Sequence, residues 1–341
     1  SLVDATDAET DVLLDIENVS TGSGNDTFTT SDADSNTLDA NGGTDTVNIE
    51  GGSGTITITR ISTDTVTASD TGLGIGSDTY IDFENVNATG SIFGDTFNLI
   101  DENNNTITGN GGTDTVQVVT NVATDDTIVI TRVGTDVTVT GSGIGTDNYN
   151  GIDTVNVSGN TGNDSFELTD ANDNTISGGD GTDTITVYSE DATGDNIGIR
   201  RTGTSVNVSS TSGSSIGNDI YLDIEQVNVS GSTGDDTFTI FDELDNIIDG
   251  GDGNDTVNYT DVSVDLVIDS SAIPAYFVVS GTGIGTDVLI SIENINTGNG
   301  NDTFIVQDEN DNYVDGGGGN DTANVTMEGI YSGIITIIRS P

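Results

Sequence analysis

Short runs in which apolar and polar residues alternate occur along the whole chain. Examples are "TITIT" (Thr55 to Thr59), "TIVITRV" (Thr127 to Val133) and "VTVTG" (Val137 to Gly141). The apolar residues are mostly valine and isoleucine, and alternation with a period of two is typical of half-buried strands. Clusters of glycine, aspartate and asparagine separate the runs and predict turns. The pattern therefore predicts an all-β protein.

The runs recur in a repeat of about 69 residues, which the phrase "IENV" or a variant of it marks. The acidic residues at this phrase mark successive copies of the repeat and are Glu17, Glu84, Asp153, Glu225 and Glu293. The whole chain then reads as one repeat array, with repeats at 17–83, 84–152, 153–224 and 225–292 and partial repeats at 1–16 and 293–341.

Each repeat contains three acidic turns. The first two turns end in aspartates whose separation along the chain is the same in all five copies, namely Asp26 and Asp45, Asp95 and Asp114, Asp164 and Asp183, Asp236 and Asp255, and Asp302 and Asp321. The third turn precedes the next first turn by a slightly shorter stretch and ends in Asp11, Asp78, Asp147, Asp219 or Asp287. So regular a spacing favours a solenoid whose coils stack about 4.8 Å apart.

Stacking at this spacing predicts that Asp78 lies above Asp95, and Asp95 above Asp114. The same order is expected for Asp147, Asp164 and Asp183, for Asp219, Asp236 and Asp255, and for Asp287, Asp302 and Asp321. The rest of each repeat holds a pair of strands such as "TITITRISTDTVTAS". This pair forms either one more coil or a hairpin-like excursion.

The composition is strongly acidic, with 58 acidic residues against 5 arginines and a formal net charge of -53. So much like charge repels itself in a compact state, so we expect the surroundings to neutralise it. Nucleic acid and anionic membrane surfaces are excluded as partners because basic surface is almost absent. No apolar run approaches the roughly 18 residues of a spanning helix. High charge and low hydrophobicity are also typical of disorder, but the periodicity argues against it.

Histidine and cysteine are absent, which excludes the usual zinc, haem, iron–sulfur and thiol chemistry. Neither histidine nor lysine is available as a base, and every pair of acids has equivalents in other repeats. We therefore predict that the chain is not an enzyme. The alternative is a β-helix glycosidase or lyase that uses two carboxylates. The start "SLVDATDAET", without methionine or an apolar signal segment, suggests a processed protein or a piece of a longer one.

Three glycine-rich stretches carry a resemblance to a known family. They are "GGDGNDTVN" (Gly250 to Asn258), "GGGGNDTAN" (Gly316 to Asn324) and "GGDGTDTIT" (Gly178 to Thr186). They resemble the nonapeptide repeats of RTX, or hemolysin-type, calcium-binding proteins. The resemblance implies a right-handed parallel β-roll or β-helix, in which Asp carboxylates and backbone carbonyls of the turns bind Ca²⁺. It also implies secretion into calcium-rich surroundings.

Calcium takes about 6 to 8 oxygen ligands, so two stacked turns must share an ion. The predicted ligands are Asp26, Asp45, Asp78, Asp95, Asp114, Asp147, Asp164, Asp183, Asp219, Asp236, Asp255, Asp287, Asp302 and Asp321, with turns shaped by Gly178, Gly250, Gly253 and Gly316. The degraded turns at Asp11 and Asp45 are expected to bind most weakly. The alternative is that these aspartates only accept backbone N–H bonds.

Two further residue types recur. The asparagines of the intervening turns are predicted to form turns or an internal amide ladder: Asn36, Asn105, Asn174, Asn246 and Asn312. A weaker cation site at Asp308, Asn310 and Asn312 is the alternative. The recurring arginines are predicted to make ion pairs to acids on the next coil, with a contact between subunits as the alternative: Arg60, Arg132, Arg201 and Arg339. N-x-S/T triplets such as Asn87-Ala88-Thr89 give a weak indication of glycosylation.

All the information in the chain is repeated, which predicts a structural role. We expect an extracellular calcium-stabilised solenoid in a surface layer, a filament or an adhesin stalk. Both ends resemble cut coils, so head-to-tail or side-by-side assembly is expected, and a cell-surface polysaccharide is a further candidate partner. The alternative is the calcium-binding secretion domain of an RTX toxin or hydrolase whose catalytic part lies elsewhere.

Overall fold

The structure is a computed structural model that describes residues 12–31, 33–51, 55–62, 64–71, 75–100, 102–120, 124–169, 171–189, 194–202, 205–211, 216–272, 276–307 and 312–326. These residues form 32 strands and no helix, and thus no helix that spans a membrane. The predicted all-β class is confirmed. The chain divides into two compact units, unit 1 (Ser1–Thr186 and Ile216–Ile224) and unit 2 (Val187–Ser215 and Glu225–Pro341).

The strands are short and closely spaced, as the alternating runs predict. Those of unit 1 are β1 (Asn18–Ser20), β2 (Thr27–Thr30), β3 (Thr37–Asp39), β4 (Thr46–Glu50), β5 (Thr55–Ser62), β6 (Thr65–Asp70), β7 (Ser77–Ile81), β8 (Asn85–Thr89), β9 (Thr96–Ile100), β10 (Thr106–Thr108), β11 (Thr115–Val119), β12 (Thr127–Val133), β13 (Asp136–Gly141), β14 (Gly145–Asn150), β15 (Thr154–Ser158), β16 (Ser165–Thr169), β17 (Thr175–Ser177) and β21 (Asn218–Leu222). Strand β18 (Thr184–Tyr188) crosses the boundary between the units.

Those of unit 2 are β19 (Asn196–Thr202), β20 (Ser205–Ser210), β22 (Gln226–Ser230), β23 (Thr237–Phe241), β24 (Ile247–Asp249), β25 (Thr256–Asn258), β26 (Leu266–Asp269), β27 (Tyr276–Gly281), β28 (Thr286–Ile290), β29 (Asn294–Asn296), β30 (Thr303–Val306), β31 (Tyr313–Asp315) and β32 (Thr322–Val325).

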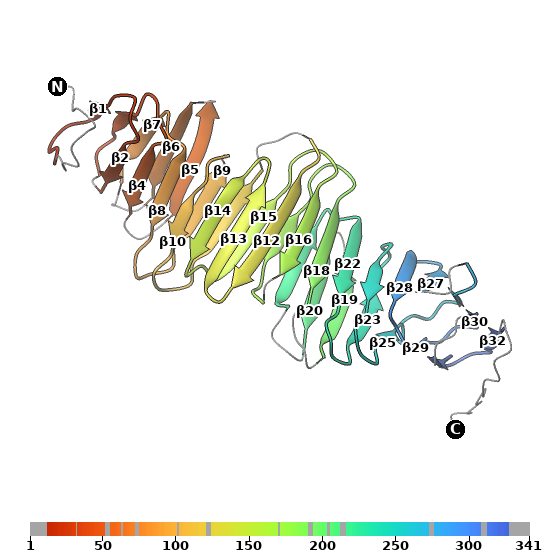
Figure 1. The fold of residues 1–341 in the computed structure, drawn as a ribbon. Helices are drawn as coiled ribbons and strands as arrows, with labels where there is room; N and C mark the ends of the chain where they lie inside the picture. The colour runs from red at the N-terminus through yellow and green to blue at the C-terminus, as the bar shows by residue number, and fades with distance from the viewer. Residues whose placement is uncertain are drawn as a thin grey trace. The chain divides into compact units, whose positions relative to one another are not determined.

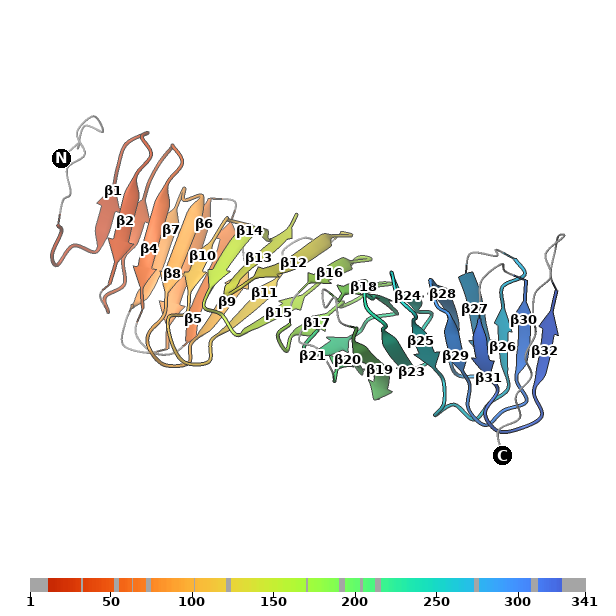
Figure 2. The same cartoon turned by 60° about the horizontal axis from the view of Figure 1, so that its bottom comes forward.

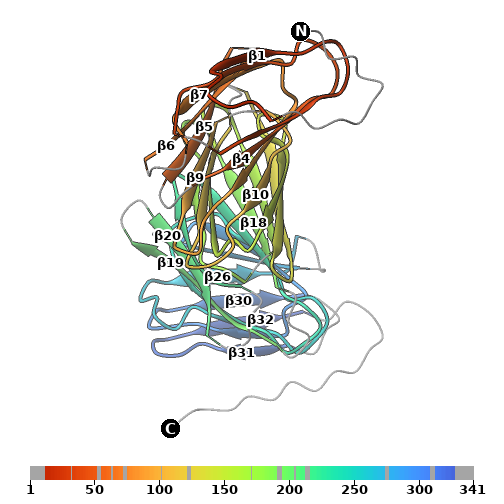
Figure 3. The same ribbon diagram turned by 90° about the vertical axis from the view of Figure 1, so that its left-hand side faces the viewer.

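The strands of each unit belong to two sheets whose pairing is mostly parallel. In unit 1 the first sheet has the order β1-β3-β7-β6-β5-β9-β11-β15-β17-β21 and the second has β2-β4-β8-β10-β14-β13-β12-β16. Thr96 in β9 pairs with Thr115 in β11, while the intervening β10 belongs to the second sheet. One coil therefore contributes one strand to each sheet. This agrees with a β-solenoid, and Figure 3 shows the two sheets of unit 1 as two layers.

The sheet order shows that the extra strand pair of each repeat is a hairpin and not one more coil. Strands β5 and β6 pair antiparallel, β6 pairs antiparallel with β7, and β5 pairs parallel with β9. The pair is therefore a hairpin that stays within the sheet, and Figure 1 shows its strands side by side. The same arrangement recurs at β12–β13, β19–β20 and β26–β27. In unit 2 the second sheet runs β22-β24-β28-β27-β26-β30-β32, part of which is visible in Figure 2.

Successive repeats use the two sheets in alternation. The strands that follow Glu17, Glu84 and Asp153 are β1, β8 and β15, which lie in the first, second and first sheet of unit 1. In the repeat from β8 to β14, the chain changes sheet after each strand, and β12, β13 and β14 lie together in one sheet. With these three counted as one, the repeat adds an odd number of segments. Equivalent residues of neighbouring repeats therefore lie in opposite sheets.

The core lies between the two sheets of each unit. Burial alternates along nearly every strand, so that Phe97 and Leu99 of β9 are buried while Thr96 and Asn98 are half-buried on the outer side. Phe97, Phe166 and Phe238 occupy equivalent positions and are fully buried. Near β7, Phe83 makes edge-on ring contacts with Phe28 and Tyr80 at 5.3 and 5.8 Å between centroids. Because coils are narrow, each buried aromatic ring fills a large share of its layer.

Candidate functional site

The aspartates of the first two turns form direct hydrogen bonds between neighbouring coils. In each of the five pairs, the backbone N–H of the first aspartate donates to Oδ1 of the second over 2.6 to 2.9 Å: Asp26 to Asp45, Asp95 to Asp114, Asp164 to Asp183, Asp236 to Asp255, and Asp302 to Asp321. The predicted adjacency of these pairs is confirmed. All predicted aspartates except Asp26 and Asp321 are at most 3% exposed. They therefore point inward rather than out of the turns.

The aspartates of the third turns lie elsewhere than predicted. Asp78 Oδ1 accepts the backbone N–H of Asn36 at 2.8 Å and the Asn36 side-chain amide at 3.2 Å. The expected position of Asp78 above Asp95 is wrong, because β6 and β5 lie between β7 and β9 in the sheet. The inserted hairpin separates the two turns.

The same correction holds for the other third turns within one unit. Asp147 is not beside Asp164, nor Asp287 beside Asp302, since a hairpin again intervenes. Each third-turn aspartate instead accepts the backbone N–H of an asparagine 41 to 45 residues earlier: Asn105 for Asp147, Asn174 for Asp219, and Asn246 for Asp287.

The asparagines also shape their own turns. Their side-chain amides donate to the backbone carbonyl two residues earlier, at Asp34, Asn103, Asn172 and Leu244 respectively. Asn36, Asn105, Asn174 and Asn246 are at most 5% exposed. The prediction that they form turns is confirmed.

The acids at the repeat boundaries belong to the same network, although the sequence analysis used them only as landmarks. Asp45 N–H donates to Glu84 Oε2 at 2.7 Å, and Asp255 N–H donates to Glu293 Oε2 at 2.8 Å. Asp114 N–H donates to Asp153 Oδ2 at 2.8 Å. The nearly constant separation of donor and acceptor along the chain is the sequence signal that marks them.

Asp126 is a buried acceptor that the sequence analysis missed. Its carboxylate accepts the backbone N–H groups of Ser142 and Gly143 and the hydroxyls of Ser142 and Thr120, at 2.9 to 3.1 Å. Burial by itself raises the pKa of Asp126, but these donors outweigh it, so the pKa is lowered. Asp195 lies at the equivalent position before β19 and accepts hydrogen bonds from Ser189 and Ser210 hydroxyls.

Four buried tyrosines donate to the third-turn aspartates. Tyr80, Tyr149 and Tyr221 lie two residues after their partners and donate to Asp78, Asp147 and Asp219 over 2.8 to 3.0 Å. In the fourth copy the residue two positions after Asp287 is Leu289, and Tyr259, which directly follows β25, donates to Asp287 Oδ2 at 2.7 Å. The recurring D-x-Y triplet is the signal that would have found three of them.

The glycines of the predicted turns leave room for backbone and carboxylate. A Cβ on Gly250 would lie 2.3 Å from Ser291 O and 2.5 Å from Asp255 Oδ2, and one on Gly253 would lie 2.3 Å from Gly234 O. Gly178 and Gly316 face the carboxylates of Asp183 and Asp321 in the same way. These four positions require glycine because neighbouring backbone and carboxylate atoms approach closely, and not because φ is positive. Positive φ occurs at the next position, as at Gly251 with φ 88°.

The fit to calcium differs among the turns. Oδ1 of each second-turn aspartate already accepts a backbone N–H from the neighbouring coil. Oδ2 of Asp236 accepts the N–H of Ser232 at 2.9 Å, whereas Oδ2 of Asp26, Asp45, Asp255 and Asp302 is buried without a hydrogen-bond partner. Nowhere in the described ranges do three acidic side chains converge on one point. The turn of Asp45, which the sequence predicts to bind most weakly, thus has the same open oxygen as the turns of Asp255 and Asp302.

Several buried carboxyl groups are harder to ionise than usual. Burial raises the pKa of Asp255 to about 6, and the nearby Asp236, Glu293 and Asp235 charges add to this. Burial raises the pKa of Asp287 to about 7, although hydrogen bonds from Tyr259 and Asn246 oppose the shift. The pKa values of Asp45 and Asp114 are raised, mainly by burial, with like charges contributing.

Two of the recurring arginines have described contacts. Burial raises the pKa of Asp242, which follows the neighbouring strand, and the nearby Arg201 charge acts in the opposite direction. Arg132 donates Nη2 to Ile152 O at 3.0 Å. The ion pairs to the next coil stay a prediction. Asp11, Asp308, Asn310, Arg339 and the side chain of Arg60 lie outside the described residues.

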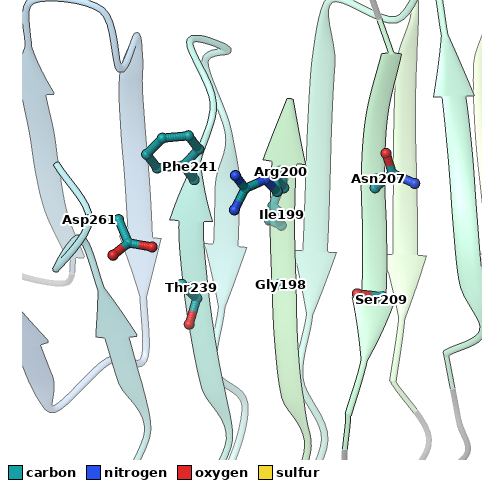
Figure 4. A pocket seen from close by; sticks show the side chains of 8 residues that line it. All are labelled: Gly198, Ile199, Arg200, Asn207, Ser209, Thr239, Phe241 and Asp261. Carbon is teal, nitrogen blue, oxygen red and sulfur yellow. The ribbon is translucent and has the colours of Figure 1, made fainter. Parts of the chain in front are cut away.

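A shallow, open depression lies on the outer face of unit 2. Figure 4 shows its lining side chains, with the Arg200 guanidinium beside the Phe241 ring and Asp261 on the far side of it. The Arg200 guanidinium carbon lies 4.9 Å from the ring centroid, a cation–π contact.

No protein-family model and no curated protein sequence matches this chain. The resemblance to RTX proteins therefore rests on the glycine-rich motifs.

Proposed function

We propose that the chain is an extracellular structural protein, a calcium-stabilised and right-handed β-solenoid of about five repeats that forms part of a surface layer, filament or adhesin stalk. The observation that carries the proposal is the repeated ladder of buried acids. Each repeat devotes its polar interior to bonds between neighbouring coils, at Asp26 and Asp45, at Asp95 and Asp114, and so on. Such a ladder suggests a rigid and stable structural protein.

Calcium is supported by charge and by open oxygens. The chain carries a formal net charge of -53 and only five basic residues to offset it. Oδ2 of Asp45, Asp255 and Asp302 is buried without a partner, and an unsatisfied buried carboxylate oxygen is costly. Carboxylate and carbonyl oxygens are the ligands that Ca²⁺ prefers. Extracellular Ca²⁺ would offset the negative charge and coordinate the unpartnered oxygens.

A non-enzymatic role is favoured because the acids pair with backbone groups of the framework. The depression at Arg200 and Phe241 contains one acid, Asp261, and no second acid or other base to work with it. Its aromatic ring and polar rim suit a weak contact with a surface polysaccharide instead. The second candidate, a secretion domain of an RTX toxin or hydrolase, is favoured by the glycine-rich motifs alone.

The decisive measurement is a calcium titration of chelator-stripped protein, followed by circular dichroism and thermal melting. We expect the β signal to gain thermal stability with Ca²⁺ and to lose it again with chelator. Light scattering at high Ca²⁺ then tests assembly. A melting temperature that ignores calcium would remove the ion from the proposal, and chains that stay monomeric at high calcium would remove the assembly.

A further inference from the structure

The depression on the outer face of unit 2 lies over three neighbouring strands, β20, β19 and β23. The register of these strands places its lining residues in two rows, which Figure 4 shows. One row is Ser209, Gly198 and Thr239, and the other is Asn207, Arg200 and Phe241. Asp261 adds a carboxylate on the far side of the ring from the guanidinium.

Gly198 leaves a gap in the first row that the fold does not require. Its φ lies outside the left-handed region, and the nearest atom to a Cβ placed there would be Ser209 Oγ at 3.9 Å. The equivalent positions of the other hairpins hold Thr57, Val129 and Asp269. Glycine weakens the middle of a strand, where it often marks the close approach of a ligand. Neither backbone conformation nor packing therefore explains this glycine.

Arg200 and Phe241 depart from the repeat at the same place. The equivalent pairs of unit 1 contain neither a cation nor a ring, and are Thr59 with Ile100 and Thr131 with Thr169. The Phe241 ring holds the guanidinium through the cation–π contact, which leaves the positive charge without a counter-ion. Arg200 is also one of only 5 basic residues in a chain with 58 acids. A positive charge is thus displayed at one end of the depression.

The other polar side chains of the depression are available to a ligand. Within the part of the chain that the structure describes, the side chains of Asn207, Ser209, Thr239 and Asp261 make no hydrogen bond to protein groups. Neighbouring strands lie about 4.8 Å apart, so the two hydroxyls stand on either side of the Gly198 gap, on strands about 9.6 Å apart. Hydroxyl, amide and carboxylate groups all pair well with the hydroxyls of a sugar.

We propose that the depression binds a carboxylate-bearing sugar, a uronic acid unit of an extracellular polysaccharide. Its carboxylate would lie on the Arg200 guanidinium, whose planar fork matches two carboxylate oxygens. The sugar ring would lie over Gly198, within reach of Ser209 and Thr239. Asp261 repels a carboxylate and accepts hydrogen bonds from hydroxyls, so the two charged ends orient the ligand. The inference rests on the proposed function for the extracellular source of the polymer.

The acidity of the whole chain does not oppose this contact. Charges more than a Debye length away, about 8 Å at physiological salt, are largely screened. A nucleic acid needs many basic residues along its backbone, whereas one uronic acid unit needs one cation at the point of contact. A second copy of this chain also offers carboxylates, but the row of hydroxyls around an open floor matches a ring with several hydroxyls better than a single acid.

The test is saturation-transfer NMR of the full chain in calcium-containing buffer with two matched probes. The probes are a short oligomer of glucuronic acid and the glucose oligomer that lacks only the carboxylates. We expect the acidic oligomer to bind more tightly by about tenfold or more, and Arg200→Gln to remove this preference. Equal affinity of wild type for both probes would overturn the carboxylate assignment, and absence of binding would overturn the site. Neither result changes the calcium-dependent melting that tests the proposed function.

A second variant tests the location without changing a charge. Gly198→Thr introduces the residue that the first hairpin has at Thr57, and it fills the gap between the two hydroxyls. Threonine is favoured in strands, so this variant should melt at or above the temperature of wild type, while its affinity for the acidic oligomer falls by about tenfold or more. The control Val129→Thr changes the equivalent position in unit 1 and should leave binding unchanged.

Two further outcomes would overturn the proposal. Unchanged affinity in Gly198→Thr would show that the sugar binds elsewhere. Wild-type dimers that Arg200→Gln separates, in the absence of sugar binding, would assign the depression to an acid of a second copy.

Discussion

The backbone N–H of Asp236 donates to Oδ1 of Asp255 over 2.7 Å, from one coil to the next. Asp255 in turn uses its own N–H to reach Glu293 Oε2 on the following coil. Each acid therefore accepts a bond from one neighbour and donates a bond to the other. Backbone N–H groups at the start of a strand would otherwise be buried without a partner, and the acids satisfy them.

Loss of one ladder carboxylate should destabilise the protein. Asp164 Oδ1 accepts the N–H of Asp126 at 2.8 Å, and Asp164→Ala leaves that buried donor unsatisfied. We expect a loss of about 1–3 kcal/mol in the free energy of unfolding, measured by urea denaturation in chelator. Asp180→Ala removes an exposed acid nearby and is the control. Equal urea midpoints for the two variants would show that the ladder bond contributes nothing.

A methyl group at a closely packed glycine should also be harmful. The Cβ of Gly250→Ala would lie 2.3 Å from Ser291 O, so the two coils must move apart. We expect a loss of about 1–3 kcal/mol, in the usual range for a steric defect. The matched variant Gly42→Ala has open space around it and should be neutral or slightly stabilising. Thermal melts of both variants test this, and the expectation fails if Gly250→Ala melts with wild type.

In chelator, stability should fall as the pH rises from about 4 to above 6. Asp255 has its pKa raised to about 6 from 3.8, so the folded chain binds more protons than the unfolded chain between these values. By linkage, the stabilisation is complete below pH 3.8 and is lost as the pH rises through about 6. Asp126, whose pKa is lowered, contributes in the opposite direction and only at lower pH.

Melting temperatures of wild type and Asp255→Asn across this range provide the measurement. The variant cannot titrate at that position, so its melting temperature should fall less as the pH rises. Asp252→Asn, at an exposed position of the same turn, should keep the full slope. If the slope of Asp255→Asn equals that of wild type, Asp255 is not the titrating group.

Removal of a core ring should be the most damaging single change. Phe238 is fully buried and pairs in register with Val257 on the next coil. We expect Phe238→Ala to cost about 3–5 kcal/mol, because a narrow coil cannot close the cavity. Phe93 is 62% exposed, so Phe93→Ala should change stability by less than about 0.5 kcal/mol. Denaturant midpoints of the two variants test this, and equal midpoints would contradict a closely packed core at Phe238.

Much of the fold follows from local pattern, but the candidate site follows only in part. The constant spacing of the first two turns is sufficient to place Asp95 beside Asp114, since both lie one coil apart in an uninterrupted stretch. The partner of Asp78 was not predictable in the same way. It is Asn36, which lies much further back along the chain, and no local rule connects the two. Asp126 was missed because it lies outside the three acidic turns that the spacing marks, and Tyr259 because its repeat lacks the D-x-Y triplet.

The sequence by itself determined the strands, their buried faces and the length of one coil, because alternation and turn residues are local properties. Only the tertiary structure decided how the hairpins enter the sheet, since parallel and antiparallel pairing bury the same alternating residues. Strand β5 pairs with β9 on one side and with β6 on the other, and this choice moves Asp78 away from Asp95 and towards Asn36. The partners of the acids are thus a consequence of strand order, which depends on backbone pairing between distant segments.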